Sequence, residues 1–233
     1  MSAIEVQGVW KFYGDFPALR DVRFNIEAGS CLALLGRNGA GKTTLLRIIA
    51  GLSRAGRGRV RILDGEAREQ ATRARLGILG HGIALYDELS AFENLHLFGR
   101  LYGLADPRET ALAWLERIGL ERVRDGLVRE FSRGMRQRLA VARAFLHDPS
   151  VLLLDEPFTS LDDRAIALLQ GLLREAISQG RTVVLSTHQL REALELATQV
   201  ALLVRGRLAY AGSRTEQMLE DTGWLYRHYG EAT

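Results

Sequence analysis

The sequence predicts an α/β fold with a parallel sheet at its core, and three patterns predict it. Short strand-like segments separated by turns fill the first third, helical apolar spacing fills the middle, and strands alternate with helices over residues 151–204. Such alternation favours a parallel sheet covered by helices. The middle block, residues 86–147, is then expected to be a helical lobe inserted into a single domain of residues 1–233.

Each element follows from the spacing of its apolar residues and from the turn residues beside it. The segment 30–35 is a short apolar run that ends at a glycine, as a buried strand does, and Gly51 stops the helix that begins at Lys42. About twenty residues follow Gly212, so we expect no regulatory domain there. Strands are expected over residues 4–13, 18–26, 30–35, 59–63, 76–79, 151–154, 182–186 and 200–204, and helices over residues 42–50, 91–102, 108–118, 135–147, 164–177 and 190–197.

Composition places the chain among globular proteins, because 47% of its 233 residues are hydrophobic and 25% are charged. No apolar run reaches the roughly 18 to 20 residues that a membrane-spanning helix needs, and residues 1–9 lack the features of a secretory signal. We therefore expect a soluble protein made in the cytoplasm, with no transmembrane segment of its own. The single cysteine, Cys31, lies in an apolar stretch and is expected to be a core residue.

The charge balance argues against a nucleic-acid partner. The 31 basic residues are nearly matched by 28 acidic ones, which leaves a net charge of +3. Arginines are dense over residues 54–75, but no aromatic residues are interleaved with them. This pattern is more typical of a solvated face than of a nucleic-acid surface.

A glycine-rich segment between a buried strand and a helix carries the strongest functional signal. Residues 36–43, Gly-Arg-Asn-Gly-Ala-Gly-Lys-Thr, fit the pattern G-x-x-x-x-G-K-[ST] in the strand-to-helix context that it requires. The glycines let backbone N–H groups point at phosphate oxygens; a merely flexible turn is the alternative interpretation. Lys42 would reach the β- and γ-phosphates, Thr43 would bind Mg²⁺ and Thr44 would face the α-phosphate. The expected ATP-binding residues of this loop are Gly36, Asn38, Gly39, Ala40, Gly41, Lys42, Thr43 and Thr44.

Acidic residues and a histidine follow two of the expected parallel strands. Asp155 and Glu156 end the apolar run 151–154; Asp155 would enter the metal shell, and Glu156 would accept a proton from a water that attacks the γ-phosphate. A strand cap is the alternative role for these acids. His188 follows the strand 182–186, so it should emerge at the same edge of the sheet and contact the γ-phosphate, unless it is a structural histidine.

Two aromatic residues precede the turn at Gly14. An exposed aromatic ring at a glycine turn offers a flat face to a base, although core packing is the alternative for both residues. We assign Tyr13 to adenine and Phe12 to the core.

Taken in order, these motifs resemble those of the nucleotide-binding subunits of ATP-binding cassette (ABC) transporters, over essentially the whole chain. Residues 131–135, Phe-Ser-Arg-Gly-Met, stand where that family has its signature, usually Leu-Ser-Gly-Gly-Gln. Residues 160–162, Ser-Leu-Asp, resemble the family's D-loop, and His188 resembles its switch histidine. The resemblance implies a P-loop NTPase with an ABC-type antiparallel β subdomain, a parallel-sheet core and an inserted helical lobe. The resemblance also implies that Ser132, Gly134 and Asp162 belong to the ATP site.

The resemblance also implies a function and partners. In that family two cassettes pair head to tail, and each ATP lies between the phosphate loop of one subunit and the signature of the other. We therefore expect an ATPase that uses ATP and Mg²⁺, with a second ATP-binding subunit as its partner in a homodimer. A separate integral-membrane transporter subunit would convert the ATP cycle into transport, which places this chain in the cytoplasm, peripheral at the inner face of the cell membrane.

The signature and one loop depart from the usual family pattern. Arg133 replaces glycine, Met135 replaces glutamine, and His81 occupies the position of a glutamine that bridges Mg²⁺, the attacking water and the lobe. We expect His81 to replace that glutamine in catalysis; the alternative is an ordinary loop residue. Together with residues 131–138, these features are similar to the ATP-binding subunit of the haem exporter used in cytochrome c maturation.

Three further functions compete with haem export. An ABC exporter of drugs or other substrates would carry the same motifs. A soluble ABC ATPase that acts on nucleic acid or ribosomes is disfavoured. The DNA-repair members of the family that the chain resembles carry a long coiled coil between the phosphate loop and the signature, but here only 93 residues separate Gly41 from Gly134. A scaffold that binds ATP without turnover is disfavoured by Glu156.

The lobe is rich in apolar and aromatic residues, most of which should pack inside it. In the resemblance the lobe also forms the groove that receives a helix of the membrane subunit, so a few should be exposed, with Tyr86 the first choice. These residues are Leu85, Tyr86, Leu89, Phe92, Leu95, Leu97, Phe98, Leu101 and Tyr102.

Overall fold

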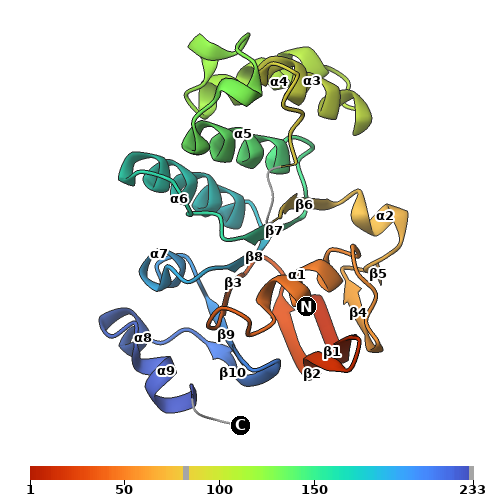
Figure 1. Cartoon of the computed structure of the whole chain (residues 1–233), viewed down its shortest axis with the longest axis vertical. Coiled ribbons are helices and arrows are strands. Elements are labelled where there is room, and N and C mark those ends of the chain that lie inside the picture. The colour runs from red at the N-terminus through yellow and green to blue at the C-terminus, as the bar shows by residue number, and fades with distance from the viewer. Residues whose placement is uncertain (81–83, 231–233) are drawn as a thin grey trace.

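Two sheets form the body of the molecule (Figure 1), which a computed structural model describes over residues 1–80 and 84–230. The antiparallel sheet has, in spatial order, β2 (Phe16–Glu27), β1 (Ser2–Tyr13), β4 (Arg57–Ile62) and β5 (Gly65–Glu66). The second sheet has, in spatial order, β10 (Arg207–Ser213), β9 (Gln199–Val204), β3 (Cys31–Leu35), β8 (Thr182–Ser186), β7 (Val151–Asp155) and β6 (Leu76–Leu79). This second sheet is parallel from β9 to β6, as the alternation of strands and helices predicts.

Helices fill the space between the sheets and cover the far face of the parallel sheet. The helix α1 (Lys42–Ile49) contacts β2 and β4 on one side and β7 and β8 on the other. The remaining helices are α2 (Gln70–Arg73), α3 (Ala91–Leu101), α4 (Pro107–Arg117), α5 (Arg133–Phe145), α6 (Asp163–Ser178), α7 (Leu190–Leu194), α8 (Glu216–Glu220) and α9 (Trp224–Tyr229), with 3₁₀ turns at Glu121–Val123 and Val128–Glu130.

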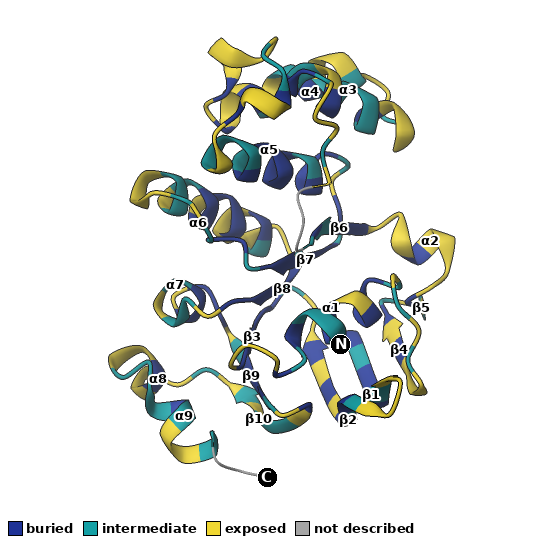
Figure 2. Cartoon of the chain, in the orientation of Figure 1, coloured by how far each residue is buried: buried dark blue, intermediate teal, exposed yellow. Residues whose placement is uncertain are grey.

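The strand β3 shows how the sequence builds a core on both faces of the sheet. Successive side chains of a strand point to opposite faces. Leu32 and Leu34 join the cluster that contains α1, whereas Cys31, Ala33 and Leu35 join the cluster on the opposite face, and all five residues are buried (Figure 2). Burial raises the pKa of the Cys31 thiol to about 12, so this thiol stays protonated as the expected core residue.

The lobe has a core of its own. Residues from α3, α4 and α5 form a third buried cluster, which lies at the end of the molecule farthest from the C-terminus in Figure 1. Over the part of the chain that the structure describes, no helix is both long and apolar enough to cross a membrane.

The expected assignment of Phe12 to the core is wrong. Its side chain is 41% exposed and stacks on Trp10, with 5.9 Å between ring centroids. The physical reason is that β1 and β2 continue to a two-residue turn beyond the region that α1 covers, so the tip of this hairpin is exposed on both faces. Sequence patterning also missed β5, β10, α2, α8 and α9, which are short or half exposed and carry little apolar periodicity.

The start of α3 allows a test of local stability. Ser90 and Glu93 form a capping box: the Glu93 N–H donates to Ser90 Oγ (3.1 Å), and the Ser90 N–H donates to Glu93 Oε2 (2.7 Å). We expect Ser90→Ala to lower the free energy of unfolding by about 1 kcal/mol, because one buried cap is lost. Chemical denaturation measures this value. Ser178→Ala, which removes an exposed hydroxyl, is the control and should change stability by less than about 0.5 kcal/mol.

Candidate active site

The loop between β3 and α1 has the backbone geometry of a phosphate cradle. Gly36 and Gly41 have φ angles of 154° and 107°. A Cβ at Gly36 would lie 2.7 Å from the Leu203 carbonyl oxygen, and one at Gly41 would lie 2.9 Å from the Ala18 carbonyl oxygen. Both positions therefore require glycine for conformation and for space. The Lys42 side chain is buried under this loop, and its Nζ donates to the Gly36 carbonyl oxygen at 2.8 Å.

Three oxygen-bearing side chains meet where α1 approaches the ends of β7 and β8. Thr43 Oγ1 donates to Asp155 Oδ2 at 2.8 Å, and Ser186 Oγ donates to Asp155 Oδ1. Hydroxyl and carboxylate oxygens are the ligands that Mg²⁺ prefers, and this ion usually takes only one or two carboxylates together with substrate phosphates. The pair Thr43 and Asp155 therefore fits Mg²⁺, as expected from the sequence.

Glu156 is held in an unusual backbone conformation directly after β7. Its φ is 53°, and its N–H donates to the Ser186 carbonyl oxygen at 2.8 Å. Its side chain is only 14% exposed, and Oε2 lies 2.9 Å from His188 Nδ1 and 3.3 Å from the His188 N–H. The histidine thus contacts the carboxylate of Glu156, whereas the sequence suggested a contact with the γ-phosphate. His188 remains 62% exposed, so its ring is open to a ligand as well.

A cavity of about 310 Å³ connects these groups to the tip of the β1–β2 hairpin. Asn38, Gly39, Ala40, Gly41, Lys42, Thr43, Thr44 and Glu156 line it together with Tyr13, Phe16 and Ala18. Tyr13 is 52% exposed, and it pairs across the hairpin with Phe16, which is 64% exposed. The sequence analysis missed Phe16. An aromatic residue on each side of the turn at residues 14–15 was the signal that could have found it.

The exposed ring of Tyr13 leads to a binding prediction. Stacking of a base on an aromatic side chain contributes about 1–3 kcal/mol. We therefore expect Tyr13→Ala to weaken ATP binding by roughly 5- to 150-fold, as measured by calorimetric titration with Mg-ATP. Phe12→Ala is the matched control, because Phe12 stacks on Trp10 and does not line the cavity. Equal affinity of wild type and Tyr13→Ala would remove Tyr13 from the adenine site.

The remaining expected ATP contacts lie outside this cavity. Ser132 caps α5, where its Oγ accepts from the Met135 N–H at 3.2 Å, and Asp162 caps α6, where its Oδ1 accepts from the Ala165 N–H at 2.8 Å. Gly134 lies close to the Ser160 carbonyl oxygen, 3.3 Å from where its Cβ would be. The signature and the D-loop of one chain are thus neighbours, but neither lines the cavity that contains Lys42. His81 lies outside the described residues.

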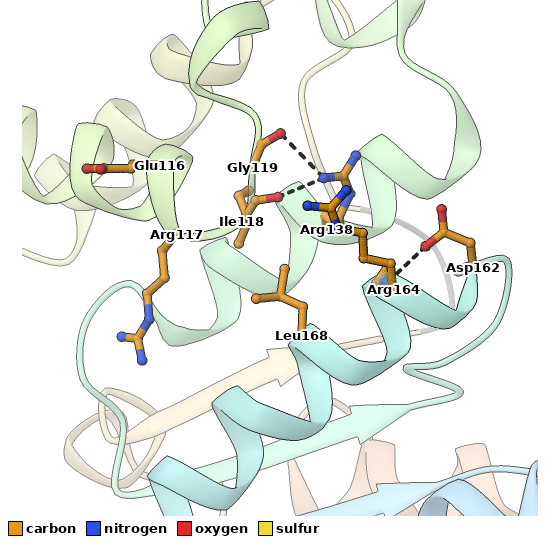
Figure 3. Close-up of a pocket in the computed structure, with 9 residues that line it drawn as sticks. Glu116, Arg117, Ile118, Gly119, Arg138, Asp162, Arg164 and Leu168 are labelled. Carbon is orange, nitrogen blue, oxygen red and sulfur yellow. Dashed lines mark hydrogen bonds between the residues drawn. The ribbon is translucent and has the colours of Figure 1, made fainter.

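A second cavity, of about 490 Å³, lies between the lobe and α6 (Figure 3). In it the Arg138 guanidinium from α5 donates to the carbonyl oxygens of Ile118 (2.8 Å) and Gly119 (3.4 Å) at the end of α4. Arg117 pairs with Glu175 of α6. Positive groups at a helix C-terminus stabilise the helix, so Arg138 stabilises the end of α4. The ion pair of Arg117 with Glu175 connects the lobe to α6.

Comparisons with known proteins agree with this geometry. Residues 19–159 match the family described as "ABC transporter". The chain is 39% identical over 226 residues to daunorubicin resistance ATP-binding protein DrrA3 of Streptomyces coeruleorubidus, covering 95% of this chain and 72% of that protein. It is 38% identical over 229 residues to the Nod factor export ATP-binding protein I of Cupriavidus metallidurans, covering 96% and 75%.

Solved structures give the same result. The structure of an ATP-binding subunit of an ABC transporter superposes with a TM-score of 0.85 at 30% identity, covering 98% of this chain and 94% of that one. The dimeric ATP-binding cassette MJ0796 in a post-hydrolysis state, bound to ADP and Pi, superposes with a TM-score of 0.82 at 28% identity, covering 91% and 99%. The chain therefore belongs to the ABC transporter family and is an ATP-binding, ATP-hydrolysing member of it.

Proposed function

We propose that this chain works as one of two cassettes paired head to tail, and that it drives export of a substrate through a separate integral-membrane subunit. One observation supports this most. Lys42, Thr43 and Glu156 line one cavity and Thr43 bonds to Asp155, whereas Ser132 lies outside this cavity as the N-cap of α5. The ATP site of a single chain is then incomplete, and a second copy would supply the anion-binding start of its own α5.

The geometry supports the following division of roles during hydrolysis. The Lys42 amine, which binds the Gly36 carbonyl oxygen of the loop, would bind the β- and γ-phosphates. Thr43 and Asp155 would hold Mg²⁺, which neutralises charge on the phosphates when bound. Glu156 would accept the proton of the attacking water, and His188 orients its carboxylate from 2.9 Å. Ser132 and Gly134 of the second cassette would bind the γ-phosphate.

An apolar cavity beside the magnesium site supports docking of the membrane subunit. Its volume is about 380 Å³, and its lining runs from Leu52 and Tyr102 at the surface to Thr43 and Asp155. Tyr86, which does not line this cavity, is 52% exposed as expected, and Leu52 and Tyr102, which do line it, are 60% and 42% exposed. Exposed apolar side chains around one opening indicate a protein contact. A helix seated here would touch Thr43 and Asp155, the residues that would hold Mg²⁺, which would link the membrane partner directly to catalysis.

The relatives and the motifs support two candidates for the transported substrate. The printed names of similar proteins refer to daunorubicin resistance and Nod factor export, and we favour an exporter of this kind. Haem export for cytochrome c maturation is the second candidate, and it rests on the similarity of residues 131–138 and of His81 to that exporter. The balanced charge of the chain argues against a nucleic-acid function.

The test is copurification from gently solubilised membranes of the native cell, combined with a visible absorption spectrum of the complex. A copurifying permease without a haem band supports an exporter similar to those named for daunorubicin resistance and Nod factor export. Cytochrome-maturation subunits with a haem band support the haem exporter instead. A Leu52→Glu, Tyr102→Glu variant should lose the membrane partner, whereas Glu216→Gln, at an exposed position of α8 that does not line this cavity, should keep it. Absence of any membrane protein with the wild type would contradict the proposal.

A further inference from the structure

Gln137, on the second turn of α5, is a buried polar residue that joins two parts of the site. It is 9% exposed, and its Nε2 donates to the carbonyl oxygen of Pro157 at 3.0 Å. Pro157 directly follows Glu156, and because proline has no N–H, this carbonyl oxygen is its only backbone polar group. Leaving a buried amide unpaired is unfavourable, so the bond fixes this turn of α5 to the chain just after Glu156.

The same face of α5 makes a second contact with the segment 157–160. Gly134 precedes Gln137 by three residues, so the two lie on one face of the helix. A Cβ at Gly134 would lie 3.3 Å from the Ser160 carbonyl oxygen. Phe158, between the two contact points, is fully buried in the cluster that α5 also joins. This segment is therefore held along the start of α5, the helix between the lobe and α6 in Figure 1.

Glu156 has a backbone conformation that depends on such support. Its φ of 53° is in the left-handed region, which a residue other than glycine keeps only where its surroundings hold it. On one side, its N–H donates to the Ser186 carbonyl oxygen of β8 at 2.8 Å. On the other side, Gln137 holds the carbonyl oxygen of Pro157. A base that is held in place before the substrate arrives reacts faster, so both contacts bear on the rate of hydrolysis.

We propose that Gln137 is a positioning residue for Glu156, through which α5 holds the proposed base of its own chain. Its wider consequence rests on the proposed head-to-tail pairing of two cassettes. There the first turn of α5 binds the ATP that lies on the partner's phosphate loop, whereas Glu156 acts on the ATP of its own loop. Nucleotide at one site therefore acts on the base of the other site through Gln137. Coupling between two sites typically changes affinity by about 5- to 150-fold, so hydrolysis should depend cooperatively on ATP concentration.

The test compares Gln137→Met with Gln170→Met in the full chain. Methionine keeps the length of glutamine but cannot donate a hydrogen bond. Gln170 of α6 is the matched control, because it is 8% exposed and its Nε2 binds the Glu192 carbonyl oxygen (3.4 Å) and Glu195 Oε2 (3.2 Å). Each variant thus loses one buried amide, and their melting temperatures should fall alike.

Only Gln137→Met should change the kinetics. We expect it to lower kcat by roughly 10- to 100-fold, since a misplacement of about 1 Å can cost that much, while KM for ATP stays close to wild type. The Hill coefficient for ATP should fall to about 1. Equal kcat for Gln137→Met and wild type overturns the proposal, as does an equal loss of kcat in both variants. A Hill coefficient that Gln137→Met leaves unchanged overturns the coupling between the sites.

Mixed pairs of differently tagged chains show which base Gln137 acts on. One chain carries Glu156→Gln, so hydrolysis occurs only at the site that uses Glu156 of the other chain. Gln137→Met should lower the rate when it is placed in the chain with Glu156 intact, and change it little in the chain that carries Glu156→Gln. The reverse pattern would assign Gln137 to the contact of α5 with the partner's ATP and would overturn the proposal.

Failure of the proposed pairing gives a different result. The Glu156→Gln variant would then remain a single chain in Mg-ATP, as measured by size-exclusion chromatography. The comparison of kcat between Gln137→Met and Gln170→Met would still decide the positioning role, because the contact of Gln137 with Pro157 lies within one chain.

Discussion

Replacing Glu156 with glutamine should reduce phosphate release by at least about 100-fold while Mg-ATP binding stays within a few-fold of wild type. Positioned general bases contribute roughly 10²–10⁴-fold to rate. Glutamine keeps the shape of the side chain and can still accept the His188 N–H bond, but its amide cannot take a proton from water. The variant should therefore bind ATP and stop before hydrolysis. Steady-state phosphate release and calorimetric titration measure the two quantities.

The same variant tests the pairing of two cassettes. If ATP holds two chains together and only hydrolysis separates them, Glu156→Gln should elute as a dimer with Mg-ATP and as a monomer without nucleotide. The control is Glu216→Gln, the same chemical change at an exposed position of α8. It should hydrolyse ATP at the wild-type rate. Equal phosphate release by Glu156→Gln and wild type would show that another group accepts the proton.

The parts of the fold that could be predicted from the sequence are those with a strong local pattern. β3 is a continuous apolar run, and β7 is one up to its last residue, Asp155. The motifs that begin at Gly36, directly after β3, and at Asp155 can be recognised from neighbouring residues alone. β10 could not be found this way, because its residues are half exposed at the edge of a sheet and it is held there by pairing with β9. Pairing between distant segments leaves little trace in local periodicity.

The same limit applies to the site. The sequence places Lys42, Thr43, Asp155 and Glu156 at one sheet edge, and the structure brings them to one place. Tyr226 lines a cavity together with residues 37–40 of the phosphate loop, although it lies 190 residues after Gly36 and no motif links them. The neighbouring Leu225 is buried against the sheet, which brings this helix to the loop. A side chain whose position depends on tertiary packing in this way cannot be identified from spacing alone.

Replacing Lys42 with methionine should weaken Mg-ATP binding by roughly 10- to 100-fold and remove measurable hydrolysis. Hydrogen bonds to charged groups contribute about 1.5–3 kcal/mol, and the Lys42 ammonium is the one lysine in this cavity that can reach the phosphates. Methionine fills a similar volume under the loop and leaves no buried charge unpaired, so the melting temperature should change little.

Arg59→Met is the control for this substitution, because it also removes one positive charge, on the exposed face of β4 where Arg59 binds Gln7. If Lys42 affected ATP binding only through the net charge of the protein, both variants would weaken ATP binding equally. Raised salt would then weaken ATP binding by the wild type to the same degree. A specific contact predicts loss in Lys42→Met alone.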